Sequence, residues 1–420
     1  MTQAIASRAA LPRLLAGLSD GPLTTLERHH GVHGVLPSDA ELHGEALVEL
    51  IADCALRGRG GAAFPVARKL RAVMAARGRP TVVANGSESE PLSGKDALLL
   101  RELPHLVLDG AELVARAVGA PRAIIAVKGS AAEHGLLERA IGERRALGRD
   151  QVNFELFAAA EGFISGQETA LVSQINGGNG LPAFQPPRVS ERGVARRPTL
   201  VQNVETLAQI ALIARHGVDW YRAIGTAEEP GSTLITLVRA GAGPAVYEVA
   251  YGTPLHDVLA AARIDATALG GLLIGGYFGT WLSAGLVNDV RLSHEALDRH
   301  DASLGCGVIA PLPASACPVA ETVRVSAYLA AQSAGQCGPC VHGSAAIARR
   351  LEAAARGTAG PLALEEVRRW TLEIRDRGAC HHPTGIGRFV ASALRTFRDQ
   401  FEEHARHGPC AACTARSLLA

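Results

Sequence analysis

The sequence has no surplus of charge of either sign and no long run of apolar residues. Lysine and arginine number 42 against 41 aspartates and glutamates, which gives a formal net charge of +1. Proteins whose main partner is a nucleic acid usually carry a basic surplus, so this balance argues against that class. A membrane-spanning helix needs about 18 or more consecutive apolar residues, and the sequence has no such stretch. We therefore predict no membrane span.

A convincing secretion signal is also missing. Residues 1–15 include Arg8 and Arg13 but lack the long apolar core of a signal peptide. We therefore expect a cytoplasmic protein.

Cysteine is nearly absent from the first two thirds of the chain, which contain only Cys54. Seven more lie in the last third: Cys306, Cys317, Cys337, Cys340, Cys380, Cys410 and Cys413. Clustered cysteines in a chain of this size, without a secretory context, indicate metal binding rather than disulfides. Cys54 lies on an apolar helical pattern and is expected in the core, and we interpret Cys306 and Cys317 as structural.

A chain of 420 residues is too long for one compact core, so about two to four domains are expected. We expect a helical or irregular arm at residues 1–40. After it, short β-branched runs alternate with helical patterns; the expected strands are residues 81–84, 123–127 and 153–157. The alternation predicts an α/β domain with a mostly parallel, covered sheet over residues 41–217.

Two smaller domains and a tail are expected after this one. Strands at residues 232–238 and 246–249, a helix at 255–262 and a strand at 272–274 suggest a small β-grasp domain at residues 230–300. From residue 319 onward the apolar spacing is helical, which predicts a helical domain at residues 316–405. A cysteine-containing tail follows at residues 406–420.

Residues 56–65 form a glycine-rich segment, Leu-Arg-Gly-Arg-Gly-Gly-Ala-Ala-Phe-Pro, and Lys69 follows it. Glycine lets a backbone approach a phosphate closely, and a following helix offers its N-terminal N–H groups. Arg57, Arg59 and Lys69 add positive charge. The segment does not follow a strand, as a Rossmann fingerprint would, so a helix end followed by an ordinary loop is an open alternative.

Three further polar segments carry candidate ligand groups. Residues 85–91, Asn-Gly-Ser-Glu-Ser-Glu-Pro, come directly after an expected strand, where α/β sheets place their ligand sites. Their amide and carboxyl side chains suit flavin ring edges and ribose hydroxyls, although a solvated loop would have the same composition. Residues 162–170 and 198–207 complete the set, and the last of these is expected to open a helix.

Together and in this order, the four segments resemble the flavin-carrying, NADH-oxidising subunit of respiratory complex I and the corresponding subunits of NAD-linked hydrogenases and formate dehydrogenases. The resemblance covers roughly residues 45–405. It includes residues 243–255 of the middle region, which look like the family's soluble-ligand-binding β-grasp domain. The resemblance implies an α/β FMN-binding domain, a β-grasp domain and a C-terminal helical iron–sulfur-binding bundle.

The resemblance also implies roles for individual residues. Gly58, Arg59, Gly60 and Gly61 would hold the FMN phosphate together with Lys69. Flavin or ribityl contacts would come from Asn85, Glu88 and Asn203. The dinucleotide would be seated by Phe64, Glu90, Phe163 and Glu168, with Phe64 stacked on its adenine. FMN suits such a protein because it accepts a hydride and releases electrons singly to iron–sulfur centres.

The C-terminal cysteines match the family's cluster motif only in part. Residues 333–340 read Ser-Ala-Gly-Gln-Cys-Gly-Pro-Cys, where the family has Ser-Cys-Gly-x-Cys-x-Pro-Cys before a distant fourth cysteine. A [4Fe–4S] cluster normally has four thiolate ligands. Here Cys337, Cys340 and Cys380 match, and the first position is Ala334.

Three interpretations of this motif stay open. The cluster persists with another fourth ligand, for which His342, His381 and His382 are candidates; a three-iron or labile cluster forms; or the site holds zinc. A purely structural Cys-Gly-Pro-Cys is the alternative without metal. Near the end of the chain, Cys410 and Cys413 with His404 and His407 could bind zinc or form a reduced, frayed tail.

Several positions on the nicotinamide side depart from the family pattern. The family's tyrosine, glutamate and aspartate are replaced by Phe163, Gln167 and Ser87, its Lys-Pro-Pro-Phe is residues 185–188, Gln-Pro-Pro-Arg, and an aromatic residue is replaced by Ala72. Stacking and charged contacts contribute much to dinucleotide recognition, so these changes are expected to weaken NADH binding. Arg188 could instead favour a phosphorylated donor such as NADPH.

The leading hypothesis is an FMN-dependent oxidoreductase that takes a hydride from NADH or NADPH and passes electrons through the cluster to a protein acceptor. The expected partner is a ferredoxin-like or [2Fe–2S] thioredoxin-like subunit. A second hypothesis keeps the flavin but replaces the nicotinamide donor with a ferredoxin-like protein. A third is a non-enzymatic scaffold with structural zinc.

Overall fold

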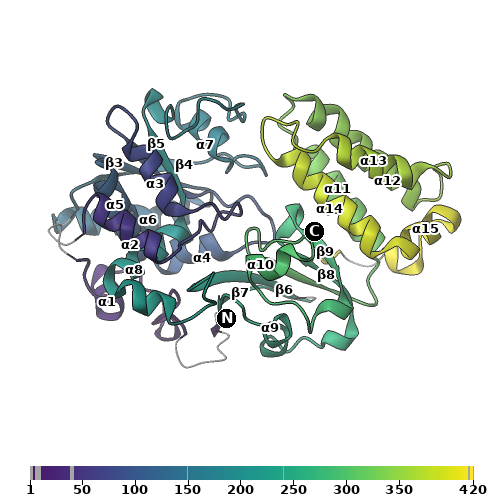
Figure 1. Ribbon diagram of the computed structural model, residues 1–420, viewed down its shortest axis with the longest axis horizontal. Helices are drawn as coiled ribbons and strands as arrows, with labels where there is room; N and C mark the ends of the chain where they lie inside the picture. Colours follow the sequence, from purple (N-terminus) through teal and green to yellow (C-terminus); the bar gives the residue numbers. More distant parts are fainter. Residues whose placement is uncertain are drawn as a thin grey trace.

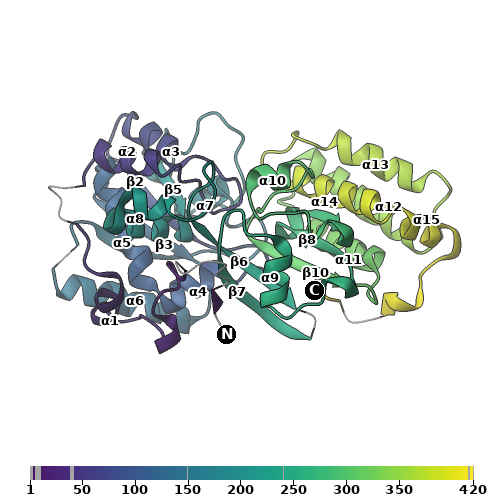
Figure 2. The same ribbon diagram turned by 60° about the horizontal axis from the view of Figure 1, so that its bottom comes forward.

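The computed structural model describes residues 3–4, 11–37, 42–148, 150–239, 241–414 and 417–419. Three parts follow one another along the chain and lie side by side in Figures 1 and 2. An α/β domain (purple to teal) comes first, a mixed sheet (green) lies in the middle, and a layer of helices (yellow-green to yellow) comes last. The predicted sequence of an α/β part, a smaller sheet and a helical C-terminal part is confirmed at this level.

Four parallel strands in the order β4-β3-β2-β5 form the sheet of the α/β domain. They are β2 (Thr81–Gly86), β3 (Arg122–Val127), β4 (Asn153–Ala158) and β5 (Thr199–Asn203). The three strands predicted from the sequence are confirmed. Residues 198–207, expected to open a helix, first form β5, because Thr199–Asn203 pairs with β2; the helix α8 begins only at Val204.

Helices cover both faces of this sheet, which is why its central strands are apolar throughout. On one face α5 (Pro104–Val118) and α8 (Val204–Arg222) pack closely at Gly110, where a Cβ atom would lie 1.9 Å from the carbonyl oxygen of Leu207. On the other face α7 (Glu168–Ile175) packs on the sheet. The remaining helices of this domain are α1 (Leu26–His33), α2 (Glu45–Asp53), α3 (Val66–Met74), α4 (Lys95–Glu102) and α6 (Ala131–Ala146).

The second sheet is mixed, with the strand order β1-β7-β6-β10-β8-β9. Its strands are β1 (Gln3–Ala4), β6 (Ser232–Arg239), β7 (Ala242–Ala250), β8 (Leu269–Ile274), β9 (Thr280–Ser283) and β10 (Val308–Pro313). Side chains alternate between its faces: Leu272 and Ile274 pack toward α9 (Leu255–Ala261), whereas Leu273 packs toward the C-terminal helices. Both faces are therefore buried.

The predicted hairpin, helix and strand of this middle region are confirmed by β6, β7, α9 and β8. No sequence pattern had indicated β9, α10 (His294–Asp298) or β10. Strand β10 lies beyond residue 300 yet pairs with both β6 and β8. The sheet therefore continues past the expected domain limit.

The C-terminal part is helical, as predicted from residue 319 onward. It consists of α11 (Pro318–Ala331), a π-helical turn (Pro339–Ser344), α12 (Ala345–Ala355), α13 (Ala363–Glu373), α14 (His382–Thr396) and α15 (Arg398–His407). Among the helices of the described ranges, none combines the length and the apolar character that crossing a membrane requires.

The N-terminal segment is packed against the rest of the chain. Of the arm expected at residues 1–40, residues 1–2, 5–10 and 38–40 lie outside the described ranges. The backbone N–H groups of Arg13, Leu14 and Leu15 donate to the carboxylate of Glu248 at 2.8, 3.0 and 3.2 Å. Glu248 is fully buried on β7, so these bonds replace the water that its oxygens lose.

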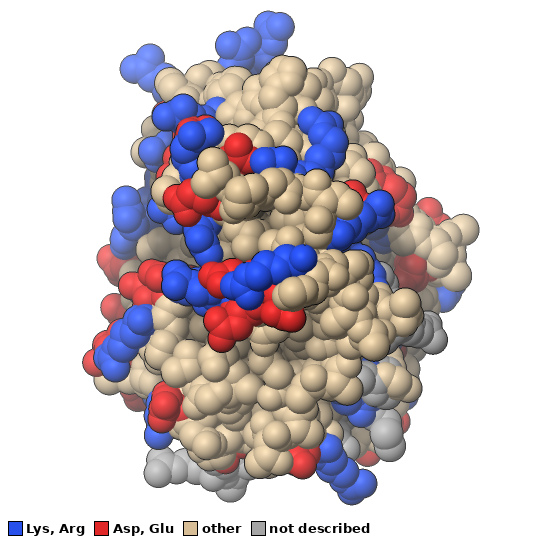
Figure 3. Space-filling model, turned by 90° about the vertical axis from the view of Figure 1, so that its right-hand side faces the viewer, with Lys and Arg blue, Asp and Glu red and all other residues tan. Residues whose placement is uncertain are grey.

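The outer face of the C-terminal helices carries charges of both signs next to one another, as Figure 3 shows. Among the ion pairs of these helices, Arg356–Glu352, Arg369–Glu373 and Arg406–Glu402 are exposed, and Arg350–Glu366, which joins α12 to α13, is half-buried. Such pairs contribute little to stability individually, and they leave this face without a field of one sign.

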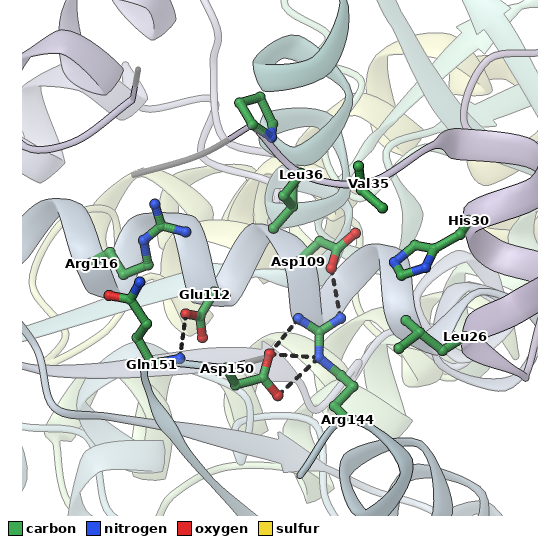
Figure 4. Close-up of a pocket in the computed structure, with 11 residues that line it drawn as sticks. Leu26, His30, Val35, Leu36, Asp109, Glu112, Arg116, Arg144, Asp150 and Gln151 are labelled. Carbon is green, nitrogen blue, oxygen red and sulfur yellow. Dashed lines mark hydrogen bonds and ion pairs between the residues drawn. The ribbon is translucent and has the colours of Figure 1, made fainter. Parts of the chain in front are cut away.

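A buried ion cluster holds α5, α6 and α8 together in the α/β domain. Arg144 of α6 donates to Asp109 of α5 at 2.6 Å and to Asp150 at 2.6 Å, as Figure 4 shows. Arg215 of α8 also donates to Asp109 Oδ2, and His29 Nε2 lies 2.8 Å from the same oxygen. Burial alone would raise the pKa of Asp109, but His29, Arg144 and Arg215 hold it well below its usual range.

We expect Asp109→Asn to lower the free energy of unfolding by about 3 kcal/mol at pH 7, because it leaves buried cations without their anion while preserving shape. The native pKa of Asp109 is depressed, so its contribution is fully present above the unfolded pKa of about 3.9 and is lost as the pH falls toward the native value. Urea unfolding at pH 7 and at about pH 2.5, which lies below the unfolded pKa, measures both effects.

The matched control is Glu373→Ala, which breaks the exposed Arg369–Glu373 pair at 3.3 Å and should cost less than about 1 kcal/mol. Equal losses in the two variants would contradict a special role for the buried cluster.

Candidate functional site

The candidate site lies where parallel strands β2 and β5 end side by side. Asn85 of β2 pairs in register with Asn203 of β5, so both side chains stand at the carboxyl edge of the sheet. Open α/β sheets bind ligands at this edge. A cavity of about 690 Å³ lies here, large enough for a sizeable cofactor or substrate.

All three parts of the chain line the cavity. From the α/β domain come Arg59, Gly60, Gly61, Ala62, Ala63, Asn85, Ser87, Glu88, Ser89, Glu90, Lys95, Asp96, Phe163, Gly166, Gln167 and Asn203. From the middle and helical parts come Gly275, Phe278, His294, Ser303, Gly305, Cys306, His381, Thr384, Gly385 and Arg388. Eight of the twelve residues expected to bind FMN or dinucleotide are therefore on this wall: Arg59, Gly60, Gly61, Asn85, Glu88, Glu90, Phe163 and Asn203.

The glycine-rich loop between α2 and α3 forms one end of the cavity. Its backbone is fixed at Arg59, whose N–H donates to Thr206 Oγ1 at 2.9 Å. A Cβ atom at Gly60 would lie 3.4 Å from the Asn203 Cβ, and Gly61 has a φ of 102°, a conformation that favours glycine. The positive φ of Gly61 therefore favours glycine there, whereas a Cβ atom at Gly60 would make ordinary van der Waals contact with Asn203.

The guanidinium of Arg59 does not supply a free charge to the cavity, contrary to what the motif suggested. It donates to the hydroxyl of Tyr251, to that of Tyr221 at 3.1 Å and to the carbonyl oxygen of Ser232 at 3.0 Å. Arg59 is buried, so these partners replace its water. The side chain fixes the loop to β6 and α8.

A buried cluster of charges lies beneath the cavity. Lys95 Nζ is 2.6 Å from Asp96 Oδ1 and 3.1 Å from Glu205 Oε2, and the amide of Asn203 donates to Asp96 at 2.6 Å. Burial alone would lower the pKa of Lys95, but Asp96, Glu205 and Glu88 raise it above its usual value. Lys95 is therefore a permanent cation at the cavity floor.

Two glutamates in the segment after β2 are half-buried on the cavity wall. Burial, with Asp96 acting in the same direction, raises the pKa of Glu88 to about 8. Burial raises the pKa of Glu90 to about 7, against the N–H groups of Tyr277 and Leu92 that stabilise its charged form. At neutral pH Glu88 therefore carries a proton and can donate a hydrogen bond, as a charged carboxylate cannot.

Aromatic rings and a helix start form the opposite wall of the cavity. Phe163 packs edge-on against Phe278 at 4.8 Å between ring centroids and against His382 at 5.8 Å. Gln167 caps α7: its Oε1 accepts the N–H groups of Thr169 and Ala170, both at 2.9 Å. The uncharged Gln167 amide therefore lines the cavity and also stabilises the N-terminus of α7.

Four expected site residues lie off the cavity wall. Gly58 donates its N–H to Phe64 O at 2.9 Å within the loop. Lys69 and Glu168 form an ion pair at 2.9 Å. Phe64 is 45% exposed, with the Arg68 guanidinium 5.4 Å from its ring centre. Arg188, considered as a phosphate ligand, does not line the cavity either; Arg388 of α14 does.

The three cysteines of the cluster motif converge from two segments. Cys337 and Cys340 flank the start of the π-helical turn, and Cys380 lies two residues before α14. The π-helical turn packs against α14, which brings the two segments together. Burial raises the pKa of Cys340 to about 12, and the thiols of Cys337 and Cys380 act in the same direction. Cys380 also adjoins His381 on the cavity wall.

Among the histidines considered as a fourth ligand, His382 is already engaged. It is buried, its Nε2 bonds Leu329 O at 2.8 Å, and its ring packs on Phe278 at 5.4 Å. His342 and His381 are exposed beside the motif.

Several cavity residues had no signal in the sequence. Phe278, Thr384 and Arg388 belong to no glycine-rich or polar motif, and only the folding of three parts around one cavity brings them there. Cys306, interpreted as structural, is also on the wall, where its thiol lies 3.6 Å from Gly275 O. Lys95 and Asp96 lie shortly after the polar segment at residues 85–91, so that segment could have indicated them.

Known proteins resemble this chain along most of its length. Residues 51–212 match the Nuo51 FMN-binding domain, and residues 320–404 match the NADH-ubiquinone oxidoreductase-F iron-sulfur binding region. An NADH-quinone oxidoreductase subunit of Streptomyces coelicolor is 28% identical over 414 residues, which are 94% of this chain and 90% of the relative.

The chain also resembles a hydrogenase subunit. The NAD-reducing hydrogenase HoxS subunit alpha of Cupriavidus necator is 30% identical over 378 residues, which are 86% of this chain but only 60% of that subunit. The crystal structure of an NAD+-reducing [NiFe]-hydrogenase in the air-oxidised state matches with a TM-score of 0.84 at 30% identity, over 97% of this chain and 69% of that one. The chain therefore belongs to the family of FMN- and iron–sulfur-binding, NADH-oxidising subunits that NADH-quinone oxidoreductases and NAD-reducing hydrogenases share.

Proposed function

We propose that this chain holds FMN in the cavity, oxidises NADH or NADPH there by hydride transfer, and passes single electrons through its C-terminal cysteine site to a protein acceptor. The observation that carries this is the adjacency of the two sites. His381 lines the cavity, and its neighbour Cys380 belongs to the cysteine motif. An electron leaving the cavity thus has a short route to the metal site.

The residues of the wall fit FMN. Ser87 Oγ is buried and has no hydrogen-bond partner among the described residues. Buried polar groups are normally hydrogen-bonded, so we infer that a bound ligand supplies the partner. Asn85, Glu88 and Asn203 add donors and acceptors, and Gly60 and Gly61 allow close backbone approach. When bound, FMN supplies a ring that accepts a hydride and releases electrons one at a time.

The remaining roles follow the geometry around that position. We assign the phosphate to the backbone of residues 58–61, which precedes α3, with Lys69 beside it, and the dinucleotide to the wall of Phe163, Phe278 and Arg388. We assign Phe64, which is exposed, to stack on adenine, and the Lys69–Glu168 pair to help seat the dinucleotide. Glu90 holds the backbone of Tyr277 at 2.8 Å and so shapes this wall.

The domain organisation is part of the proposal. We assign the FMN domain to residues 41–217 and the helical iron–sulfur domain to residues 316–405, preceded by the arm at 1–40 and followed by the tail at 406–420. A β-grasp assignment for the middle sheet is supported by its hairpin, helix α9, and the parallel pairing of β6 with β10. Because of that pairing, we extend the domain from the expected 230–300 to residue 313.

We further propose that Cys337, Cys340 and Cys380 would hold a [4Fe–4S] cluster, one of whose irons would lack a cysteine ligand because the first position of the motif is Ala334. Among the described residues, these three thiols are not within the spacing that one metal ion requires. This favours a cluster over a single zinc ion, because the iron atoms of a cluster hold their thiolates further apart. Its acceptor would be a ferredoxin-like or [2Fe–2S] thioredoxin-like subunit.

Ala334→Cys should convert this cluster into an ordinary four-cysteine one. The wild-type cluster is expected to lose its unligated iron in air, because no thiolate holds it. The variant should retain about four irons per chain under the same exposure, measured by iron analysis and by electron paramagnetic resonance. Ala331→Cys, on the preceding helix, is the control and should not change iron retention. A wild-type cluster as stable as the variant's would contradict the three-cysteine assignment.

Anaerobic addition of NADH or NADPH should bleach the absorbance of flavin-loaded protein. Gln167→Glu restores the charge found in the family and can still cap α7. It should strengthen binding of the reducing donor about fivefold, since a hydrogen bond to a charged group is worth about 1 kcal/mol more than a neutral one.

A flavin that only dithionite reduces, in both proteins, would instead support the second hypothesis, a ferredoxin-like donor. The uncharged Gln167 favours this alternative, because the cavity lacks the charge that the family has at this position. Protein that takes up no flavin at all would contradict both.

FMN binding should weaken above pH 8, because Glu88, assigned to the flavin, then loses its proton and places a second negative charge beside Asp96. One proton is involved, so the dissociation constant should rise about tenfold for each further pH unit. Glu88→Gln imitates the protonated form and should bind with a constant that does not change over this range. A wild-type pH profile that the variant reproduces would show that another group titrates.

A further inference from the structure

Four side chains outside the flavin cavity and the cluster motif converge on one point. They are Cys317 at the start of α11, His404 of α15, and Cys410 and Cys413 of the tail. One ligand atom from each lies within 4.8 Å of all the others. Within the ranges that the structure describes, no other group of three or more cysteine, histidine or acidic residues is arranged in this way.

The spacing of these atoms is that of a tetrahedral metal site. The Sγ of Cys413 is 3.5 Å from that of Cys317 and 3.6 Å from that of Cys410, and His404 Nε2 is 3.6 Å from Cys317 Sγ. Zinc bonds sulfur at about 2.3 Å and nitrogen at about 2.0–2.1 Å, so the edges of its coordination tetrahedron measure about 3.8 Å between sulfurs and about 3.6 Å between sulfur and nitrogen.

The groups around the four ligands are also those of a metal site. His404 Nδ1 lies 3.3 Å from the carbonyl oxygen of Ala355, which directs the lone pair of Nε2 toward the sulfurs. The N–H of Ala320, in the first turn of α11, donates to Cys317 Sγ at 3.4 Å. Arg324 donates to the carbonyl oxygen of Cys413 at 2.9 Å, which fixes the tail beside the ligands.

We infer that Cys317, His404, Cys410 and Cys413 bind one zinc ion as a closed structural site, separate from the proposed cluster. Three thiolates and one imidazole fill a tetrahedron and leave no position for substrate or water. Soft sulfur ligands with tetrahedral geometry select zinc over magnesium, calcium or manganese. On binding, the three thiols lose three protons to solvent, and nothing is oxidised or reduced.

The site would fasten the end of the chain to the helical layer. Beyond Cys413, the N–H groups of Leu418 and Leu419 donate to Glu321 of α11 at 3.2 Å, and Leu419 is buried. The hydroxyl of Tyr277 donates to the carbonyl oxygen of Leu419. Because Tyr277 also donates its N–H to Glu90, the docked tail supports the wall of the flavin cavity.

The test is metal analysis of the full-length chain purified without added zinc, using the wild type, Cys410→Ser and Cys413→Ser. Cys410 is exposed, so its replacement should leave the fold intact. We expect one zinc per chain in the wild type and loss of most of it from both variants after dialysis against a chelator. Cobalt substituted for zinc should show the visible absorbance of a tetrahedral thiolate site.

Matched controls separate this site from its neighbours. His407→Ala removes an exposed histidine three residues from His404 and should keep the zinc, whereas His404→Ala should lose it. Cys340→Ser should lose iron but keep zinc, which tests this site independently of the proposed cluster. Hydrogen exchange at residues 410–419 should become faster in Cys410→Ser.

Wild-type protein without zinc would overturn the proposal. So would zinc that survives in Cys410→Ser and Cys413→Ser but is lost from Cys340→Ser. A disulfide between Cys410 and Cys413 in freshly prepared protein, found by mass spectrometry, would also overturn it, because neither sulfur could then bind the ion as a thiolate.

Discussion

The arrangement of the molecule depends on one fully buried carboxylate, that of Glu205 at the start of α8. It accepts the N–H of Leu234 at 2.9 Å and the hydroxyl of Thr233 at 3.1 Å, both on β6 of the mixed sheet. It also faces Lys95 and Arg59 from the α/β domain. A buried charge is tolerated only where such partners surround it, so Glu205 fixes the two sheets relative to each other and thereby the cavity between them.

The parts of the site that could be predicted from the sequence are those that local patterns indicate, and the rest depend on contacts between distant segments. Asn85 was found because its segment follows an expected strand, where α/β sheets place their ligand sites. Asn203 was named only through the family resemblance, since residues 198–207 were expected to open a helix and β5 was not predicted. Arg388 and Phe278 could not be found in this way, since they reach the cavity only through packing between parts far apart in the sequence. Arg59 shows the opposite error. Its charge was evident in the sequence, but the two tyrosines that accept its hydrogen bonds come from α8 and from the turn after β7.

The fold was predictable to the same extent. Local patterns identify β2, β3, β4 and the β6–β7 hairpin, because apolar alternation and turn residues are local properties. Strand β10 escaped because only its partners β6 and β8, distant in sequence, make it a strand. Cys317 was set aside for the same reason, since His404 lies 87 positions further along the chain.

The two sets of metal-binding cysteines are nested in the sequence, which affects how the C-terminal helices fold and take up metal. Cys337 to Cys380 lies wholly inside Cys317 to Cys413, so metal at both places would close one loop within another. Closing a chain loop removes entropy from the unfolded state, and the cost grows only slowly with length. Zinc bound between Cys317 and Cys413 would stabilise the C-terminal helices in the absence of iron. A chain synthesised under iron shortage would then be folded and able to bind the cluster later.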